Sequence, residues 1–378
     1  MAMLLQEVTR QLRPMVERND TLRALAKATL AREARLRHSL AHWAPALITP
    51  RPRQVTVAIT ADCNLRCRGC RYGRDFMTGE RLALQTVLDV LEDANDAGVD
   101  RVRFYGGEPL LHPDLPAMVA RAHELGLRPY LTTNGTHLGR KIDALFEAGL
   151  RLATVGFYGI GPDYDDYTQK RDHFRRLEAS LTTIREKYGQ RFELQLNFVV
   201  LRDTCTVEHL HAAWDFARRF DMFFHLDLAN YSAPFFVQGF DNDIQLRQED
   251  RPRVEAVACA MLKLKQAEPK RFLHSPEFIR SVPDWLLKGP AMRVPCDAYE
   301  LLWIGADGTL QLCDVALPLG NVRETRLRDL LFTDAHRRAA RDGFKLKCPN
   351  CTCKVEPRIQ KDAASQRRYA RPLPGERP

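Results

Sequence analysis

The sequence has no run of about twenty uninterrupted apolar residues, the length that a membrane-spanning helix needs. It also lacks a basic, then apolar, then small-residue leader, because Glu7, Arg10 and Arg13 interrupt the first sixteen residues. No motif in which aromatic and basic residues alternate, as in many nucleic-acid-binding proteins, is present. We therefore expect a cytoplasmic protein with no nucleic-acid partner.

The 378 residues include ten cysteines, but these are clustered instead of being spaced in even pairs along the chain. Eight of the ten fall into two groups, and Cys205 and Cys259 stand apart from both. Clustered thiols fit a reducing compartment, where thiolates bind metals instead of forming disulfides. An isolated free cysteine is most often a small buried apolar residue, and we expect this role for Cys205 and Cys259.

The first group consists of Cys63, Cys67 and Cys70, which directly follow the strand-like run Val55 to Thr60. A structural zinc site would need a fourth cysteine or histidine, and the next histidine is His112. Three thiolates on one loop can instead hold three corners of a cubane iron–sulfur cluster, which leaves the fourth iron open. The spacing favours a cluster whose open iron binds a non-protein ligand.

A second motif follows one strand–helix unit later. The strand-like run Arg101 to Tyr105 leads into Gly106, Gly107, Glu108 and Pro109. Two glycines let the backbone approach a ligand closely, and Glu108 can accept a hydrogen bond from a ligand ammonium group. This segment is therefore a candidate binding turn.

Together, the Cys-x3-Cys-x2-Cys and Gly-Gly-Glu-Pro motifs resemble those of the radical S-adenosylmethionine (SAM) superfamily. In that family the amino and carboxylate groups of SAM chelate the open iron, and the Gly-Gly-Glu-Pro motif contacts the amino group. Reductive cleavage of the sulfonium then gives a 5′-deoxyadenosyl radical. The resemblance implies a [4Fe–4S] cluster and SAM as cofactors, with flavodoxin or ferredoxin as electron donor.

Three further residues are candidates through the same resemblance. Asn134 lies in a Thr-Asn-Gly tip that resembles the family's turn near the ligand, and Asn197 lies where the family often uses a polar residue for the ribose or carboxylate. An ordinary turn and a capped strand residue are the alternatives. The family commonly has an aromatic residue before the third cysteine, whereas this chain has Gly69, so Tyr72 becomes the candidate adenine contact.

Strand-like and amphipathic runs alternate along the chain, which predicts an α/β fold with a parallel sheet. Six such units, together with the resemblance, predict a partial (β/α)6 TIM-like barrel with its ligands at the C-terminal ends of the strands. The predicted strands are Val55 to Thr60, Arg101 to Tyr105, Arg128 to Thr133, Leu152 to Gly156, Leu194 to Leu201 and Phe223 to Leu228.

The second cysteine group is Cys296, Cys313, Cys348, Cys351 and Cys353, with a hairpin-like turn at Gly308. On residue chemistry alone, a zinc ribbon and an iron–sulfur site are equally good interpretations. The pattern is similar to the SPASM and twitch extensions of radical SAM enzymes, but it has five cysteines instead of seven. The resemblance implies one auxiliary [4Fe–4S] cluster, held by Cys296, Cys313, Cys348 and Cys351, with Cys353 as a spare or as the replacement for Cys351.

The predicted organisation has four parts. An N-terminal helical segment covers residues 1–53, the barrel and its linker 54–285, the cysteine-rich β-hairpin/helix extension 286–356, and a disordered basic tail 357–378. The first segment carries ten basic and four acidic residues, or six of the formal net charge of +9. We expect it to cover part of the open barrel, with membrane-surface contact as the alternative.

The sequence thus predicts a radical SAM enzyme that abstracts hydrogen from a small molecule such as a sugar, lipid precursor or natural product. Oxidation, epimerisation and C–C or C–S bond formation are all open outcomes, and no motif identifies a substrate or a substrate-specific catalytic residue. The alternatives are a peptide maturase and a non-catalytic metal or nucleic-acid-binding protein. A peptide substrate is less favoured because the N-terminal segment is too short for a winged-helix recognition element.

Overall fold

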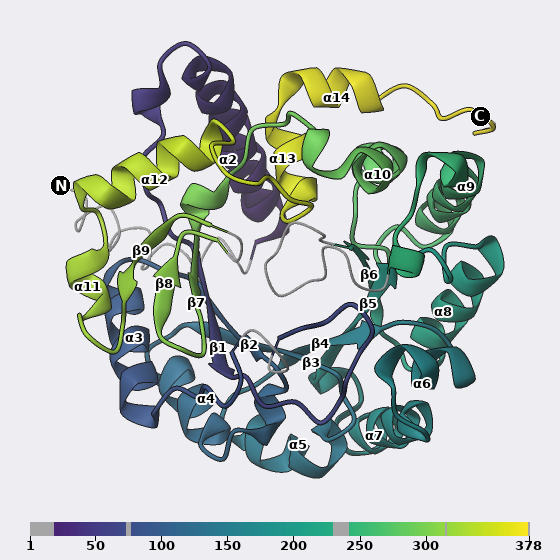
Figure 1. The fold of residues 1–378 in the computed structure, drawn as a ribbon, viewed down its shortest axis with the longest axis horizontal. Coiled ribbons are helices and arrows are strands. Elements are labelled where there is room, and N and C mark those ends of the chain that lie inside the picture. Colours follow the sequence, from purple (N-terminus) through teal and green to yellow (C-terminus); the bar gives the residue numbers. More distant parts are fainter. Residues whose placement is uncertain (1–18, 73–76, 230–241, 314–315, 377–378) are drawn as a thin grey trace.

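The computed structural model describes residues 19–72, 77–229, 242–313 and 316–376. Their strands form one nine-stranded sheet in the order β6-β5-β4-β3-β2-β1-β7-β8-β9, with helices around its outer face (Figure 1). No helix within these ranges is long and apolar enough to cross a membrane. Residues 1–18 of the predicted N-terminal helical segment lie outside the described residues.

Six parallel strands and their intervening helices form the barrel, so the predicted fold class is confirmed. The strands are β1 (Gln54–Thr60), β2 (Arg101–Gly106), β3 (Arg128–Thr133), β4 (Leu152–Phe157), β5 (Glu193–Val200) and β6 (Phe223–Leu228). The helices are α3 (Leu84–Asp96), α4 (Leu115–Glu124), α5 (Leu138–Glu147), α6 (Pro162–Thr168), α7 (His173–Tyr188) and α8 (Val207–Arg219). The sequence did not predict the short helix α6.

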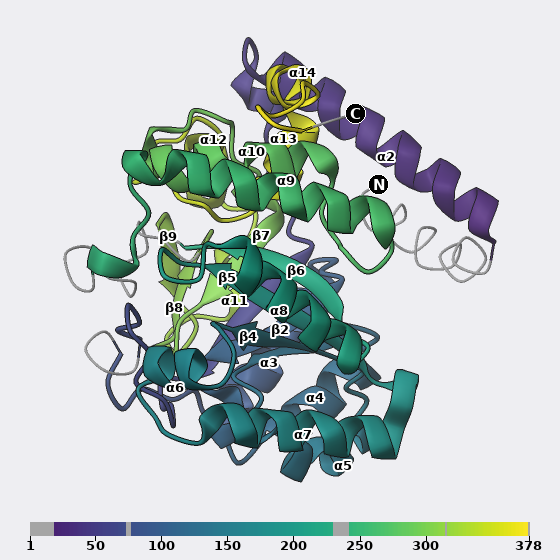
Figure 2. The ribbon, with the colours of Figure 1, turned by 90° about the vertical axis from the view of Figure 1, so that its right-hand side faces the viewer.

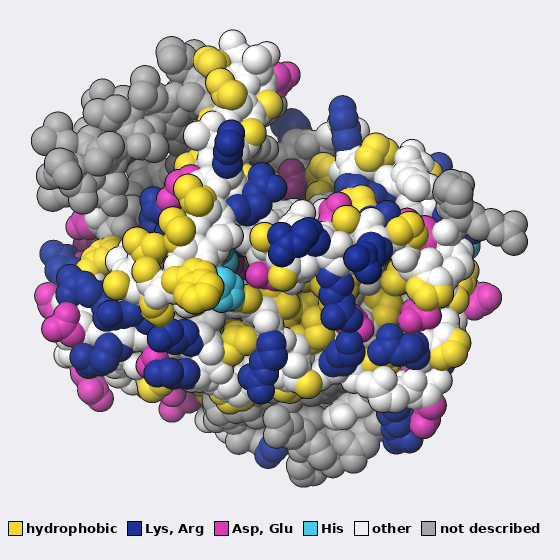
Figure 3. All heavy atoms as spheres, turned by 90° about the horizontal axis from the view of Figure 1, so that it is seen from above, with side chains coloured by type: hydrophobic (Ala, Val, Ile, Leu, Met, Phe, Trp, Pro, Cys, Tyr) yellow, Lys and Arg dark blue, Asp and Glu magenta, His cyan; other side chains and the backbone are white. Residues whose placement is uncertain are grey.

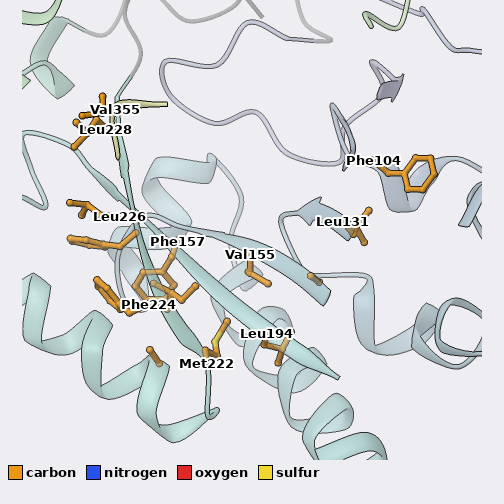
Figure 4. Close-up of a cluster of buried hydrophobic side chains, with 14 of the residues drawn as sticks. Phe104, Leu131, Val155, Phe157, Leu194, Met222, Phe224, Leu226, Leu228 and Val355 are labelled. Carbon is orange, nitrogen blue, oxygen red and sulfur yellow. The ribbon is translucent and has the colours of Figure 1, made fainter. Parts of the chain in front are cut away.

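Strands β2, β3, β5 and β6 bury alternate side chains, which separates a helix-facing core from the inside of the barrel, whereas β1 and β4 are buried along nearly their whole length. On β5, Leu194, Leu196 and Phe198 are fully buried in the main core, while Gln195 and Asn197 between them are partly accessible. Figure 4 shows part of this core, in which Leu194 lies near the side chains of neighbouring strands. The barrel interior is therefore left to the polar positions of each strand.

The C-terminal extension continues the barrel sheet. Strand β7 (Leu301–Ile304) pairs in parallel with β1, and β8 (Thr309–Gln311) and β9 (Pro318–Asn321) follow in antiparallel order. Two separate helices, α11 (Leu327–Leu330) and α12 (Asp334–Phe344), follow β9, with a break between them. The break falls at Phe332, where φ is +57°, and the Thr333 side chain caps α12 by accepting from the N–H of His336.

The predicted disordered tail is wrong for the described residues up to 376. Helices α13 (Val355–Lys361) and α14 (Ala363–Tyr369) pack against α10 (Pro276–Lys288), which follows α9 (Arg251–Ala267). Asp284 on α10 accepts hydrogen bonds from Arg368 (2.7 Å) and Tyr369 (3.0 Å), and Ile359 and Tyr369 are buried. A basic composition suggested disorder, but these two apolar residues anchor the segment to the core.

The N-terminal helix α2 (Asp20–Ala41) packs against the extension, as its contact with α13 shows (Figure 2). His38 is buried, and its Nε2 lies 2.9 Å from the hydroxyl of Tyr299. The other faces of α2 and the segment after it expose Leu25, Leu36 and Trp43. From above, the molecule carries hydrophobic and basic side chains next to one another (Figure 3).

Candidate functional site

Cys63, Cys67 and Cys70 lie on the loop after β1, at the C-terminal end of the barrel strands. All three are partly buried. They are close enough to interact electrostatically, since Cys70 affects the pKa of Cys63, and Cys63 and Cys67 both affect the pKa of Tyr164. Burial raises the pKa of the Cys63 thiol to about 12. The three thiols therefore lie in one region. Because burial favours the protonated thiol, a bound metal would have to stabilise the thiolate forms.

Charged residues hold this loop against α6 and the end of the barrel. The backbone N–H of Arg68 donates to the carbonyl of Tyr167 at 2.8 Å. The Arg68 guanidinium pairs with three carboxylates from separate segments, those of Asp166, Asp203 and Asp243. The loop is thus tied to several elements at once, which supports a defined geometry for the cysteines.

The two glycines of the second motif allow the chain to pass close to the cysteine loop. A Cβ atom on Gly106 would lie 2.2 Å from the carbonyl oxygen of Thr60, and one on Gly107 would lie 2.4 Å from those of Ala61 and Asp62. The N–H of Gly107 donates to the carbonyl of Thr60 at 2.8 Å. The glycines therefore accommodate the chain's own backbone, a role that the sequence did not indicate.

Glu108 joins the ends of β2 and β3. Its carboxylate is fully buried and accepts from Thr133 Oγ1 (2.7 Å), the N–H of Asn134 (2.8 Å) and the N–H of Leu110 (3.0 Å) in the short 3-10 helix Pro109–Leu111. Burial raises the pKa of Glu108 to about 7 despite these donors. Both carboxylate oxygens accept hydrogen bonds from groups of the protein. Glu108 therefore links the ends of β2 and β3 whether or not it also contacts a ligand.

Asn134 connects the same corner to the cysteine loop. Its Nδ2 donates to Asn64 Oδ1 at 2.8 Å, and its Oδ1 accepts from the N–H and hydroxyl of Thr136. Asn64 stands directly after Cys63. The ends of β1, β2 and β3 are therefore joined by one hydrogen-bond network.

The structure explains why Gly69 differs from the aromatic residue expected before the third cysteine. Gly69 has φ +76°, and a Cβ there would lie 2.7 Å from Ile244 Cδ1. Ile244, in the 3-10 helix Asn242–Ile244, is buried and fills this space. The candidate adenine contact Tyr72 is 5% exposed and accepts a hydrogen bond from the N–H of Ala306 at 3.4 Å, so it links the loop to the extension.

Three tyrosines form a wall beside the cysteine loop that motif reasoning did not assign. Tyr158 and Tyr167 stack with ring centroids 4.2 Å apart, and the Tyr164 hydroxyl lies 3.4 Å from the carbonyl of Asn134. Burial raises the pKa of Tyr158 and of Tyr164 well above the usual value, and nearby Cys67 adds to both shifts. The three-residue spacing of Tyr164 and Tyr167 is consistent with helix α6, but the sequence prediction made no use of it.

The five C-terminal cysteines line a single, largely enclosed cavity. Apolar residues, Gly343, Asn350 and Lys354 complete its lining, and burial raises the pKa of Cys296 to about 12. The structure thus brings together thiols that are up to 57 positions apart, from Cys296 to Cys353. Cys351 and Cys353 both line the cavity, so either one is placed to be the fourth ligand.

Arg358 supports this cavity from within the core. It is fully buried and donates to the carbonyls of Cys351 (2.9 Å) and Val294 (2.6 Å) and to Asn350 Oδ1 (3.1 Å). Its positive charge lowers the thiol pKa of Cys296, opposing burial. A buried cation beside several thiols suits a site that gains negative charge when the thiols ionise.

We expect an Arg358→Met variant to lose about 3 kcal/mol of unfolding free energy, because three buried acceptors would lose their donor. The matched control is Arg337→Met, since Arg337 is half exposed and pairs with Asp334 on its own helix. That control should change stability by less than about 0.5 kcal/mol. Anaerobic denaturant unfolding measures both, and equal effects of the two variants would contradict the structural role of Arg358.

Among the residues that the structure describes, no three His, Cys, Asp or Glu side chains are close enough together to hold one metal ion. A cubane cluster instead places each thiolate on a different iron atom. Three thiols on one loop and five around one cavity fit clusters of this kind.

Comparisons with known proteins agree with this chemistry. Residues 57–204 match the Radical SAM superfamily. The chain is 33% identical over 162 residues to the probable GTP 3′,8-cyclase of Methanothermobacter thermautotrophicus, covering 42% of this chain and 50% of that protein. It is 34% identical over 129 residues to the GTP 3′,8-cyclase of Chlorobaculum tepidum, covering 34% and 39%.

Solved structures extend the likeness beyond the barrel. The native anSMEcpe structure with bound AdoMet superposes with a TM-score of 0.61 at 15% identity, over 84% of this chain and 97% of that one. Streptococcus suis SuiB gives a TM-score of 0.59 at 16% identity, over 93% and 83%. At such low sequence identity, these superpositions show a shared fold alone.

Residues 57–204, which include both sequence motifs, thus match the radical SAM superfamily, in agreement with the family predicted from those motifs. Enzymes of this superfamily use a [4Fe–4S] cluster and SAM. The match spans about half the length of the first of the GTP 3′,8-cyclase relatives. It therefore does not show that this chain has their activity. The individual roles of Tyr72, Asn134 and Asn197 stay predictions.

Proposed function

We propose that this protein is a radical SAM enzyme that abstracts hydrogen from a small-molecule substrate inside the barrel. The observation that carries the proposal is the joining of Cys63, Cys67 and Cys70 to the Gly106–Gly107–Glu108 corner at the C-terminal ends of the strands. When bound, the cluster and SAM supply one-electron reductive cleavage of the sulfonium and a 5′-deoxyadenosyl radical.

The chain's own residues position and shield that chemistry. The three thiolates would hold the cluster, while Arg68 and Asn64 keep their loop against the barrel. The stacked Tyr158 and Tyr167 limit water access beside Cys67. Gly106 to Pro109, Asn134, Asn197 and Tyr72 are the proposed SAM contacts.

We further propose one auxiliary [4Fe–4S] cluster in the C-terminal cavity. Cys296, Cys313, Cys348 and Cys351 are its proposed ligands, with Cys353 as the alternative to Cys351. Arg358 would balance the negative charge of the bound thiolates. A cluster in this position could bind substrate or take the electron of a product radical in a net oxidation.

The proposed partners are a small-molecule substrate and flavodoxin or ferredoxin as the electron donor, in the cytoplasm. GTP belongs among the candidates because the curated relatives are named GTP 3′,8-cyclases. A peptide is the second candidate class, since one structural neighbour is SuiB bound to the precursor peptide SuiA. We propose no role for the exposed face of α2 in membrane binding.

Anaerobically reconstituted protein tests the proposal. We expect about eight iron atoms per chain, enough for two cubanes, and deoxyadenosine formation from SAM under reducing conditions. About four iron atoms together with bound zinc would overturn the auxiliary cluster. Full iron loading without any deoxyadenosine would overturn the catalytic proposal.

A Cys348→Ala variant separates the two clusters. It should lose about half of the iron and retain the ability to cleave SAM, because Cys348 lies in the C-terminal cavity and away from the loop after β1. Iron analysis and deoxyadenosine assay check this. An unchanged iron content would remove Cys348 from the ligand set.

A further inference from the structure

An open hollow of about 490 Å³ lies on the surface where the ends of helices α2 and α12 meet. The ring of Phe344, the last residue of α12, lies with its centroid 5.7 Å from that of His42. Both helices lie at the top of the molecule in Figures 1 and 2. The lining comes from three segments: the end of α2, Arg293 and Pro295 before the first cysteine of the extension, and residues 344–347.

The charged side chains that line this hollow are all basic. They are Arg293, Lys345 and Lys347, with His42 beside them, and among the residues that the structure describes no Asp or Glu lines the hollow. Arg293 and Lys345 are exposed, and neither forms an ion pair within the described part of the chain. Lys347 pairs with Asp342 at 3.1 Å. Basic groups gathered in this way create a positive potential that attracts an acidic partner.

An exposed aromatic side chain stands next to this basic surface. Trp43 directly follows His42, and its side chain is 90% exposed. Leu40, one turn earlier on α2, is exposed as well. Tryptophan and arginine are enriched in protein–protein interfaces, and exposed apolar groups rimmed by polar ones mark interaction sites. The surface therefore has the composition of a docking site for another protein.

The hollow shares a wall with the cavity that contains the five C-terminal thiols. Leu346 lines both spaces. Cys348 of the cavity comes directly after Lys347 of the hollow. Likewise, Cys296 of the cavity comes directly after Pro295 of the hollow. A protein docked on the hollow would thus lie against the wall of the proposed auxiliary-cluster site.

The backbone at this wall takes an unusual conformation for its residue type. The N–H of Leu346 donates to the carbonyl of Gly343 at 3.0 Å, and the N–H of Lys347 donates to that of Asp342 at 2.9 Å. These two bonds end α12 in a Schellman motif, in which the position of Leu346 usually holds glycine. Leu346 has φ +56°, which is unfavourable for a residue with a Cβ atom. Glycine would relieve this strain but would remove the side chain that lies between the hollow and the thiols.

We propose that this basic hollow is the docking surface for an acidic one-electron carrier protein of the flavodoxin class, which reduces the auxiliary cluster across Leu346. One electron leaves the reduced carrier and enters the oxidised cluster; no bond forms or breaks, and no proton is transferred to the cluster. Electron-transfer complexes are small and weak, so a surface of this limited extent suffices. This inference rests on the proposed function, since it names the partner of the proposed auxiliary cluster.

The first experiment measures the binding of a flavodoxin to reconstituted holoenzyme by calorimetry, at low and at high salt. Arg293→Glu and Lys345→Glu should each weaken binding about fivefold or more at low salt, because each replaces attraction by repulsion. The loss should shrink at high salt, which screens exposed charges. Arg175→Glu is the matched control, because Arg175 is exposed on α7, at the opposite end of the molecule in Figures 1 and 2. The control makes the same change in net charge and should leave binding nearly unchanged.

The second experiment follows the electron. Cys67→Ser protein should keep only the C-terminal cluster, so its visible absorbance reports that cluster alone. Reduced flavodoxin should bleach this absorbance, and the further change Lys345→Glu should slow the bleaching about fivefold at low salt. Dithionite is a small reductant that needs no docking surface, and it should reduce the cluster to the same extent with and without Lys345→Glu.

Several outcomes would overturn the docking surface. Unchanged flavodoxin affinity in both folded variants, or an equal loss in Arg175→Glu, would each do so. Binding without reduction of the C-terminal cluster would refute the electron transfer. Tighter binding of a single-stranded oligonucleotide than of flavodoxin, lost in the same variants, would assign the hollow to nucleic acid instead. Iron content and thermal unfolding check that each variant folds, so that one remains interpretable if the other fails. Failure of the holoenzyme to form deoxyadenosine with dithionite, where no carrier is present, would instead count against the proposed function.

Discussion

A Cys67→Ser variant is expected to form deoxyadenosine from SAM about a thousandfold more slowly or not at all, equal to about 4 kcal/mol of lost transition-state stabilisation. The reason is that the loop supplies three thiols and Cys67 is the central one, packed against the buried cluster of Tyr167, Leu201 and Ile244. A serine hydroxyl is a poor ligand for iron in place of a thiolate. The loop would then be left with two thiols for the cluster.

The measurement combines iron content with anaerobic deoxyadenosine formation. Iron should fall by about half, because the C-terminal cavity keeps all five of its cysteines. Cys259→Ser is the matched control, since Cys259 lies on α9, apart from both groups, with its Sγ 3.8 Å from the carbonyl of Pro374. Near-normal SAM cleavage by the Cys67→Ser protein would refute the assignment of this loop as the cluster site.

A Gly107→Ala variant should have the second largest effect, with a fall in SAM cleavage of about a hundredfold or more. The added Cβ would lie 2.4 Å from two carbonyl oxygens, those of Ala61 and Asp62, and backbone atoms cannot rotate away as a side chain can. Either the cysteine loop or the end of β2 must move. Both carry the site, so the cysteines and Glu108 would lose their relative positions.

Visible absorbance of the reconstituted cluster and deoxyadenosine formation measure this effect. Gly126→Ala is an informative control: it has φ +77°, yet nothing lies within 4 Å of an added Cβ. It should cost about 1 kcal/mol in backbone strain and leave cleavage largely intact. Equal activity of the two variants would show that the close approach at Gly107 does not matter.

Periodicity predicted the barrel well because its physical cause is local. Each strand of the barrel buries one row of side chains against helices, as Leu194, Leu196 and Phe198 do on β5, and that alternation is visible in the sequence. Strand boundaries agree within a few residues; β3 and β6 match the predicted ranges, while β5 begins at Glu193, one residue before the predicted Leu194. The ends of helices and strands depend on caps and tertiary contacts, which the pattern does not carry.

The tail shows where composition misleads. Its charged residues are common in disordered segments, and no alternating pattern marks a buried face. Yet Arg358 lies fully buried against the ring of Trp285, 4.6 Å from its centroid. The groups that make this burial favourable, Cys351, Val294 and Asn350, are brought to Arg358 only by folding.

By itself the sequence indicated the family that residues 57–204 match, the fold class and the two groups of thiols, because cluster ligation and strand alternation depend on spacing along the chain. The tertiary structure decided the roles of the residues that surround the thiols and line the inside of the barrel. Gly107 makes room for backbone, Ile244 fills the space beside Gly69, and Asn197 orients His225 and Asp227. Such roles depend on which atoms meet across distant segments, and a linear pattern does not contain those distances.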